Sequence, residues 1–429
     1  MSGNKIGFWA VFALVTGSQI GTGVFMLPAS LAPYGGYSLA GWVISGCGAV
    51  VLALVFGLLC ARFPQTGGPH VYVSQAFGPV AAFFTGWTYW VISWVSTTAV
   101  VVTAIGSLSP FLGGLSSTYY LLLEIVLLFT ITVLNLKGVK TAGGAEIFLT
   151  LLKFVPLLII PLAALAFFDA GNMVVEPQVA SLPMSTLLGQ VALLTLWGFI
   201  GVESATAPAG AVENASKTIP RAIIMGTICV ALLYLINSVG IMGLIPGGEL
   251  VHSKAPYVDA VQRMFGGNWH FGIAIIASIV CIGTLNAWML TSGQIVLGLA
   301  QDGLMPKFFG KRNENDAPVV GIIVSCLGIT PLLVLTANES IAQQVTAIID
   351  FSVTAFLFVY LACAVALLRV LFRERGKYFL LQVFLGSVAV SYCGWVIYET
   401  SVKTLLIASF FVVSGVPVYL MWYKRRRKA

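Results

Sequence analysis

The stretch from Gly17 to Gly23 reads Gly-Ser-Gln-Ile-Gly-Thr-Gly and lies in the middle of a long apolar segment near the start of the chain. A second stretch, Trp-Gly-Phe-Ile-Gly-Val-Glu-Ser, occupies residues 197–204 of another apolar segment. Glycine costs about 1 kcal/mol in a helix interior, and a carboxylate is expensive at membrane depth. Either stretch alone could serve close helix packing, but two of them together predict two broken helices.

The composition places the surrounding segments in lipid. Of 429 residues, 59% are hydrophobic and only 9% are charged, with a net charge of +7, whereas a soluble domain has about 25% charged residues. These values exclude a soluble enzyme, a disordered chain and a disulfide-stapled secreted domain. The apolar runs are longer than barrel strands, and lipid requires their backbone hydrogen bonds to be satisfied internally. We therefore expect an all-α polytopic membrane protein.

Hydropathy windows of about 19 residues place twelve transmembrane helices along the chain. The first could also be a signal peptide, because Lys5 precedes apolar residues, but it lacks a small-residue cleavage pattern and continues into more apolar chain. The twelve predicted spans are residues 7–33, 38–62, 80–107, 119–136, 144–168, 186–212, 221–245, 270–300, 318–337, 342–369, 378–399 and 403–423.

The two interrupted spans are the first and the sixth, which predicts a pair of five-helix repeats. The first repeat covers residues 1–170 and the second covers 184–370, and residues 371–429 add two helices and a basic tail. Unwound segments at the bilayer midplane expose backbone groups, and in such repeats they form the substrate site. Helix N-termini favour anions and freed carbonyls favour cations, so a zwitterionic amino acid suits both.

The positive charges predict the orientation. Eighteen of the 22 Lys and Arg residues fall on the side of the N-terminus, which by the positive-inside rule places both termini in the cytoplasm and the chain in the cytoplasmic (inner) membrane. The tail from Lys424 to Lys428 follows a span directly. It therefore indicates contact with anionic lipid of the bilayer rather than with nucleic acid.

Neither a cofactor nor a metal is indicated. The seven cysteines all lie in apolar spans, without a CxxC pair, and the three histidines share no metal-ligand spacing. The chain has no phosphate-binding GxxxxGK[ST] loop, so we expect neither ATP-driven pumping nor an enzymatic activity.

Several motifs resemble the amino acid–polyamine–organocation superfamily. Its first-helix signature matches Gly21-Thr22-Gly23-Val24-Phe25, and its sixth-helix region matches residues 196–204, 212–214 and 219–221. Shorter matches at 245–246, 255–256, 301–303 and 317–319 extend the likeness over the whole chain. Within the superfamily, the basic amino acid/polyamine antiporters that exchange arginine for agmatine or putrescine for ornithine are most similar. The resemblance implies the leucine-transporter-type fold with two inverted repeats, and relatives form homodimers.

The resemblance also implies roles for individual residues. Gly21, Thr22 and Gly23 would hold the substrate carboxylate through backbone amides, and the backbone near Trp197 and Ile200 would receive the α-amine. Trp197 would also cover the substrate. The aromatic residues could equally pack the core or line the membrane interface. The remaining candidates near the substrate are Ser18, Ile20, Tyr89 (a gating tyrosine), Ser93, Thr97 and Trp288.

Three ionisable residues are predicted at membrane depth. Glu203 matches a glutamate linked to protonation, although it could instead cap a half-helix. Lys153 resembles a lysine that replaces bound sodium in proton-coupled members, although it could instead reach back to the inner interface. Asp350 is predicted near the midplane, where an acid could pair with a substrate's distal cation, pair with Lys153 or bind a proton. Ser18 and Thr97 replace amides of the arginine exchangers, which argues against carrying over arginine specificity.

We expect a small-molecule transporter with one of two mechanisms. The first is an exchanger of basic amino acids with related amines. The second is a proton-coupled symporter of mostly neutral amino acids, in which Lys153 and Glu203 handle protons and Asp350 is structural. A receptor or channel built on the same fold is disfavoured, because no appended soluble domain and no continuous polar stripe are visible.

Overall fold

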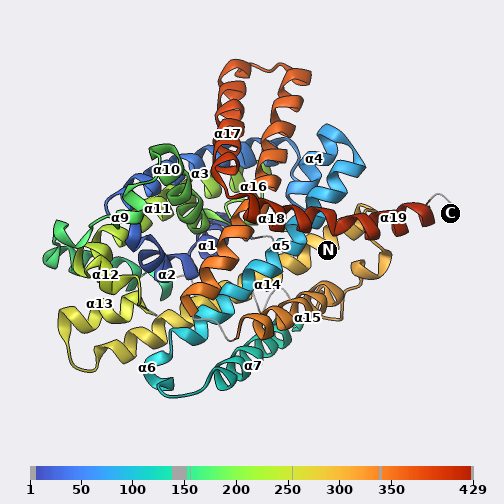
Figure 1. The fold of residues 1–429 in the computed structure, drawn as a ribbon. Coiled ribbons are helices and arrows are strands. Elements are labelled where there is room, and N and C mark those ends of the chain that lie inside the picture. Colours follow the sequence, from blue (N-terminus) through green and yellow to red (C-terminus); the bar gives the residue numbers. More distant parts are fainter. Residues whose placement is uncertain (1–5, 138–151, 155, 254, 338–340, 427–429) are drawn as a thin grey trace.

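The computed structural model describes residues 6–137, 152–154, 156–253, 255–337 and 341–426, without the side chains of 22, 211, 341–347 and 423–426. These residues form helices and no β-sheet; one isolated parallel bridge joins Ile6 to Val212. Figure 1 shows the long helices α5 (Pro79–Gly106), α7 (Ser117–Leu136), α14 (Trp269–Gln301) and α15 (Val319–Thr336) packed side by side.

The first and sixth spans are both interrupted, as predicted. The first consists of α1 (Phe8–Gln19) and α2 (Thr22–Leu31), and the sixth begins as α10 (Met184–Leu196) and continues in short 3-10 turns. The other spans are α3 (Tyr37–Arg62), α11 (Ala215–Leu244), α16 (Ile341–Glu374), α17 (Phe379–Glu399) and the pair α18 (Val402–Val413) and α19 (Gly415–Arg426). Short helices α4 (Pro69–Phe77), α6 (Ser109–Leu112), α9 (Pro177–Ala180), α12 (Gly247–Leu250) and α13 (Pro256–Phe265) connect them.

Part of the prediction lies outside the described residues. The fifth span, predicted at 144–168, is described from residue 152 onwards, where residues 152–154 and 156–164 are helical and a 3-10 turn follows. Its beginning, Lys5, Lys140, Lys254 and the side chains of the tail from Lys424 to Lys428 are not described. The division of the chain into repeats at 1–170 and 184–370 stays a prediction.

One predicted boundary was wrong, and one predicted span has an internal turn. The seventh span begins at Ala215 instead of residue 221, after Asn214 in a left-handed conformation (φ 46°). The helix includes Lys217 and the polar residues beside it, which a hydropathy window excludes. The last span was predicted with nearly correct bounds, since one candidate span covers Val402–Trp422, but a turn at Ser414 divides it into α18 and α19. There the indole nitrogen of Trp87 donates to the Ser414 hydroxyl at 2.9 Å, and the ring lies so close to Gly415 that a Cβ would be 2.7 Å from it.

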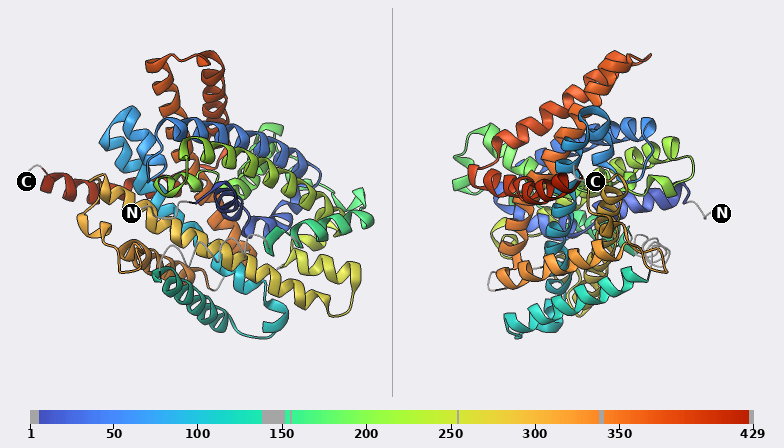
Figure 2. Two further views of the ribbon diagram at one scale, coloured as in Figure 1. Left: turned by 180° about the vertical axis from the view of Figure 1, so that it is seen from behind. Right: turned by 90° about the vertical axis from the view of Figure 1, so that its right-hand side faces the viewer.

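The helices form two sets that meet at the first span. In one set α3 packs along α11 and α10; in the other α5 packs along α14 and α16. Figure 2 shows the same arrangement from two further sides. Because α1 packs against both α11 and α14, its interruption lies between the two sets.

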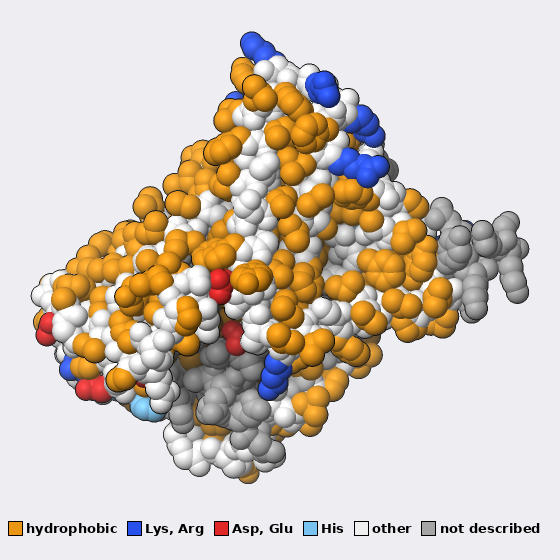
Figure 3. All heavy atoms as spheres, turned by 45° about the horizontal axis from the view of Figure 1, so that its top comes forward, with side chains coloured by type: hydrophobic (Ala, Val, Ile, Leu, Met, Phe, Trp, Pro, Cys, Tyr) orange, Lys and Arg blue, Asp and Glu red, His pale blue; other side chains and the backbone are white. Residues whose placement is uncertain are grey.

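The molecular surface is apolar over wide areas. Large side chains are exposed on α7, α15 and α17, among them Phe129, Leu335 and Leu380, the last at 81%, and Figure 3 shows hydrophobic side chains across one face. A soluble monomer rarely exposes contiguous apolar surface of this extent. Ten helices of the described chain are long and apolar enough to cross a membrane, with shorter apolar helices at 152–167 and 184–199.

Candidate functional site

The break in the first span lies at Ile20 and Gly21. Ile20 is extended (φ −80°, ψ 97°), and Gly21 (φ −143°, ψ −136°) precedes α2. A helix end leaves its last carbonyls and its first amides without partners in the helix. The N-cap residue of α2 is Gly21, which has no side chain that could accept hydrogen bonds from the first amide groups of the helix.

Side chains from three other helices instead bind the carbonyl groups at the end of α1. Tyr234 of α11 donates to the Gln19 carbonyl at 2.8 Å, and Thr284 of α14 donates to the Ile20 carbonyl at 2.8 Å. The Ser18 carbonyl accepts from the indole of Trp288 at 3.4 Å, and the Gly17 carbonyl accepts from Lys153 at 2.9 Å. These hydrogen bonds therefore stabilise the unwound conformation at the end of α1. Thr284 and Tyr234 were not predicted from the sequence.

The break in the sixth span is longer. After α10, residues Trp197–Phe199 form a 3-10 turn, Ile200 is extended, and Gly201 adopts φ +105°, which L side chains rarely occupy. The chain then continues in 3-10 turns at Ser204–Thr206 and Ala209–Ala211. A second half-helix was expected here; the structure has these short turns instead.

Glycines bring the two breaks into contact. A Cβ on Gly201 would lie 2.9 Å from the Cβ of Ser18. A Cβ on Gly23 would lie 3.0 Å from the Trp197 ring. Both positions therefore need glycine for the backbones to approach this closely. Close packing of small residues, the alternative role of these glycines, thus occurs within the site itself.

A small cavity of about 20 Å³ lies where the two breaks meet, and we call it the central cavity. This volume is enough for about one water molecule, so the structure is closed around the site. The lining residues come from both breaks and from α5 and α14: Ser18, Gln19, Gly21, Gly23, Ser96, Val100, Trp197, Ile200, Thr284 and Trp288.

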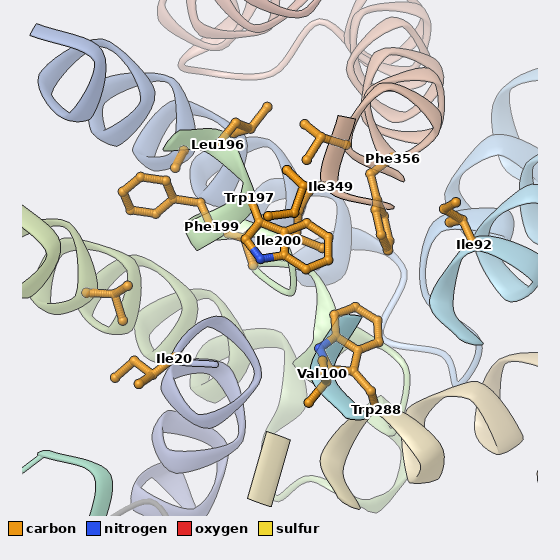
Figure 4. Close-up of a cluster of buried hydrophobic side chains, with 14 of the residues drawn as sticks. Ile20, Ile92, Val100, Leu196, Trp197, Phe199, Ile200, Trp288, Ile349 and Phe356 are labelled. Carbon is orange, nitrogen blue, oxygen red and sulfur yellow. The ribbon is translucent and has the colours of Figure 1, made fainter. Parts of the chain in front are cut away.

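Aromatic side chains cover one side of the central cavity. Trp197 and Trp288 line it, and Figure 4 shows the ring of Phe356 next to theirs, with Ile349 beside Trp197. The centroids of Trp288 and Phe356 are 5.8 Å apart, and both tryptophans are buried. These rings offer apolar area and π faces that attract cations.

Glu203 is fully buried directly after the second break. Tyr89 of α5 donates to one of its carboxyl oxygens at 2.9 Å, and Tyr360 of α16 donates to the other at 2.6 Å. The Tyr89 ring also packs edge-on against Phe356, with centroids 6.0 Å apart. The carboxyl group is thus linked to the two helices that flank the aromatic rings.

Lys153 is fully buried and reaches the first break rather than the interface. Its ammonium donates to the Gly17 carbonyl at 2.9 Å and to the Thr284 hydroxyl at 3.1 Å. The same hydroxyl donates to the Ile20 carbonyl at 2.8 Å. A fixed positive charge therefore lies beside oxygen atoms of the kind that bind alkali cations.

Comparison with known proteins identifies the family. The family model described as amino acid permease matches residues 6–423. The chain belongs to the amino acid permease family. The resemblance seen in the motifs is thereby confirmed, and the permease is a multi-pass membrane protein of a family of transporters.

The relatives include three transporters with cationic substrates in their names. A putrescine transporter of Haemophilus influenzae is 30% identical over 423 residues, 97% of this chain and 96% of the relative. A cadaverine/lysine antiporter of Escherichia coli is 30% identical over 336 residues, 78% and 75% of the two chains. A putative arginine/ornithine antiporter of Bacillus subtilis is 28% identical over 449 residues, 96% and 94%.

A solved structure supports the fold class. The permease matches a Na+-coupled sialic acid symporter, solved in a substrate-bound outward-open state, with a TM-score of 0.59 over 94% of this chain and 90% of that chain. The identity is 10%, so the match concerns the fold alone.

Some predicted site residues of the permease lie beside the central cavity without lining it. Ser93 and Thr97 donate to backbone carbonyls of their own helix, and Ser96 and Val100 line the cavity in their place. Ser18 lines it, but its hydroxyl donates to the Leu14 carbonyl at 2.7 Å. Ile20 takes part through its backbone. The side chain of Thr22 is outside the described part of the chain.

Asp350 does not reach the central cavity of the permease. The neighbouring Ile349 faces Trp197 (Figure 4), and consecutive residues of a helix point about 100° apart. Asp350 instead lines a second cavity of about 510 Å³, which we call the acidic cavity. A depth can be estimated from the sequence, but the direction in which a side chain points depends on how its helix is rotated in the bundle.

A third cavity of the permease, about 370 Å³, is lined by Leu14, Thr66, Pro208, Gln294 and Arg312 among others. Leu14 precedes the break in the first span, whereas Ser30 and Tyr34 of the acidic cavity follow it. The two larger cavities therefore lie on opposite sides of the central cavity along this span.

Proposed function

We propose that the permease is a secondary active exchanger of basic amino acids and related amines, working by alternating access in the cytoplasmic membrane with both termini inside. The contact between the two helix breaks at Gly201 and Ser18 around a closed central cavity carries the proposal. The names of the relatives, which include putrescine, cadaverine, lysine, arginine and ornithine, favour cationic substrates.

The first break suits the carboxylate of an amino acid. The amides of Gly21, Thr22 and Gly23 lie at the start of α2, whose N-cap Gly21 has no side chain to bind them, and a helix N-terminus carries a partial positive charge. Backbone carbonyls of the second break, around Trp197 and Ile200, suit the α-ammonium. The backbone thus binds the groups common to all amino acids and leaves selectivity to the side chains.

The aromatic rings suit the substrate's aliphatic chain and its distal cation. Trp288 and Phe356 provide apolar surface with π faces, and a cation–π contact contributes about 0.5–2 kcal/mol. Trp197 closes the cavity on one side. Because about 20 Å³ cannot hold an amino acid, binding requires a rearrangement that opens the central cavity towards one of the two larger cavities.

The buried ionisable groups suit the coupling of binding to conformational change. Lys153 takes the place of a sodium ion between the first break and Thr284, so we propose transport without sodium. Glu203 is joined through Tyr89 and Tyr360 to α5 and α16, so a change in its protonation would alter contacts between the two sets of helices. No covalent chemistry is required.

One observation favours the second candidate, a proton-coupled symporter of neutral amino acids. The described lining of the central cavity contains no carboxylate that could pair with a distal cation. A neutral side chain such as that of leucine would fit the same aromatic surroundings.

Counterflow in proteoliposomes separates the two candidates. The exchanger takes up labelled arginine, ornithine or lysine when a cationic partner is loaded inside, and uptake stops when the inside is empty. Uptake that needs only a pH gradient, and that prefers alanine or leucine, would establish the symporter instead. Replacing external sodium by choline leaves the exchange unchanged in either case.

A further inference from the structure

The acidic cavity is the largest of the three cavities described here, at about 510 Å³, and it is separate from the central cavity. It lies between the end of the first span, α10, α16 and the turn from α17 to α18. Ligand cavities usually measure about 300–1,000 Å³, so a small organic molecule fits here without the opening that the central cavity requires. Its lining comprises Ser30, Pro33, Tyr34, Thr186, Gly189, Gln190, Leu193, Leu194, Asp350, Glu399, Thr400, Ser401 and Thr404.

Two carboxylates from different helices face this cavity. Asp350 of α16 and Glu399 of α17 are both half-buried, and within the described chain neither forms an ion pair. Glu399 packs against α10 at Gly189, where an added Cβ would overlap with the Cβ of Glu399. The glycine thus makes room for the glutamate. Partly buried negative charges without a partner are costly unless a cation compensates them.

No basic side chain lines the acidic cavity in the described structure. Lys403 is exposed on α18 and is not among the lining residues. The remaining groups are hydroxyls, the Gln190 amide and apolar side chains, and Tyr34 already donates to Gln190 at 3.2 Å. A ligand with two positive ends is therefore favoured, whereas an amino acid would bring a carboxylate that finds no positive partner.

We infer that the acidic cavity is a second binding site, specific for an aliphatic diammonium ion held between Asp350 and Glu399. It differs from the central cavity, where backbone groups suit a zwitterion. This inference rests on the proposed function for its biological meaning: the site loads the diamine that is exchanged, before the diamine enters the central cavity.

The acidic cavity lies next to Trp197, the residue that closes the central cavity on one side. Leu193 and Leu194 line it, and Trp197 follows one turn later on the same chain. Ile349, which neighbours Asp350, faces Trp197 in Figure 4. A diamine in the acidic cavity is thus separated from the central cavity by Trp197 and Ile349, and a movement of these two side chains connects the sites.

Protection of an introduced cysteine tests occupancy directly. Thr186→Cys places a thiol in the lining, in a background where Cys47 and Cys229 are replaced by serine because the other cysteines are buried. We expect putrescine to slow the reaction of this thiol with a membrane-impermeant maleimide at least fivefold, and lysine or leucine at equal concentration to do so less. Adding Asp350→Asn and Glu399→Gln abolishes the protection by putrescine.

A matched control separates a defined site from a general electrostatic field. Glu176 is exposed, and its backbone amide binds the Pro33 carbonyl at 2.9 Å, so it lies at the same end of the molecule but outside the lining. We expect Glu176→Gln to keep the protection. Equal loss in Glu176→Gln, or full protection in the Asp350→Asn/Glu399→Gln variant, overturns the inference. Should the double variant fail to fold, Glu399→Gln alone provides the same test.

Transport measurements on the same variants distinguish this inference from the proposed function. With putrescine as the external substrate, we expect the apparent KM to rise about tenfold in the Asp350→Asn/Glu399→Gln variant, because local carboxylates concentrate the cation. If no cationic pair exchanges in the unmodified permease while the protection persists, the exchanger proposal fails and the diamine site stands. If exchange occurs without protection, the diamine site fails.

Discussion

The ammonium group of Lys153 lies 2.9 Å from the carbonyl oxygen of Gly17, in the last turn before the first span breaks. The two residues are 136 positions apart in the chain, and the lysine is fully buried. The positive charge thus stabilises the negative end of α1 and fixes the helix whose interruption forms one wall of the central cavity. The interaction joins the conformation of the break to the fifth span.

Lys153→Met is expected to reduce exchange at least tenfold. The substitution keeps most of the length of the side chain but removes its charge and its hydrogen bonds, which include those to Gly17 and Thr284, and each hydrogen bond to a charged group contributes about 1.5–3 kcal/mol. Counterflow of arginine in proteoliposomes measures the effect. The control is Lys403→Met, which removes an exposed charge from α18 and should leave exchange and melting temperature unchanged. If Lys153→Met transports with an unaltered pH dependence, Lys153 has no part in proton handling.

Gly201→Ala is expected to impair transport more than stability. The residue has φ +105°, and an added Cβ would lie 2.9 Å from Ser18, so the substitution strains the backbone and pushes the two breaks apart. A strained backbone alone costs about 1–3 kcal/mol. Exchange should fall at least tenfold.

Gly78→Ala provides the comparison for Gly201→Ala. Gly78 also has a positive φ, +83°, but nothing lies within 4 Å of an added Cβ. Gly78→Ala therefore introduces the backbone strain of a positive φ without a steric contact like that between residue 201 and Ser18. Gly201→Ala should lose at least as much melting temperature in detergent as Gly78→Ala, and Gly78→Ala should retain exchange. If the two variants transport equally well, the contact between the breaks does not matter for transport.

The positions of both breaks could be predicted from the sequence because their signal is local. Glycines clustered at membrane depth have no place in a lipid-facing helix, and the observed break at Ile20 and Gly21 lies inside the predicted stretch. Most span boundaries could be predicted from hydropathy, because hydropathy is also a local property of the sequence. Charged helix ends, such as the first turns of α11, were missed because they extend beyond the apolar window.

The groups that surround the breaks could not be predicted because they come from distant parts of the chain. Tyr360 is 157 residues from Glu203, and Thr284 is 264 residues from Ile20. Neither residue has a distinctive neighbourhood in the sequence. On α5, Thr97 was predicted and Ser96 was not. Adjacent helical residues point about 100° apart, and the cavity lies on the side of Ser96.

Asp259 predicts a pH dependence of stability outside the membrane spans. Asp259 on α13 is exposed overall, but the partial desolvation of its carboxyl raises the pKa above its ordinary value, and the hydrogen bond from Ser253 opposes this effect. The folded protein therefore binds the proton more tightly than the unfolded chain does. The resulting stabilisation is complete below the ordinary aspartate pKa of about 3.9 and is lost as the pH rises through the raised value.

Asp259→Asn should remove this dependence. We expect the variant to melt at a higher temperature than the unmodified permease at pH 7 and at the same temperature at pH 4, as measured by fluorescence in detergent. Asp169→Asn is the control, since Asp169 is also an exposed acid but lies in another connecting segment, where its carboxylate accepts from the Gly171 amide. A gap between Asp259→Asn and the unmodified permease that stays constant across this pH range would contradict the linkage.

Glu203→Gln is expected to flatten the pH dependence of exchange. The buried carboxyl group accepts hydrogen bonds from Tyr89 and Tyr360. Glutamine has nearly the same shape as glutamate, but its amide does not bind or release a proton in this pH range. Initial rates of arginine counterflow between pH 5 and 8 should vary severalfold in the unmodified permease and much less in the variant. Glu124→Gln is the matched control, because Glu124 is also a buried carboxyl but lies on α7, away from the central cavity. Two variants with equally steep profiles would show that protonation of Glu203 does not control exchange, and the tyrosine contacts would then serve to hold the sixth span against α5 and α16.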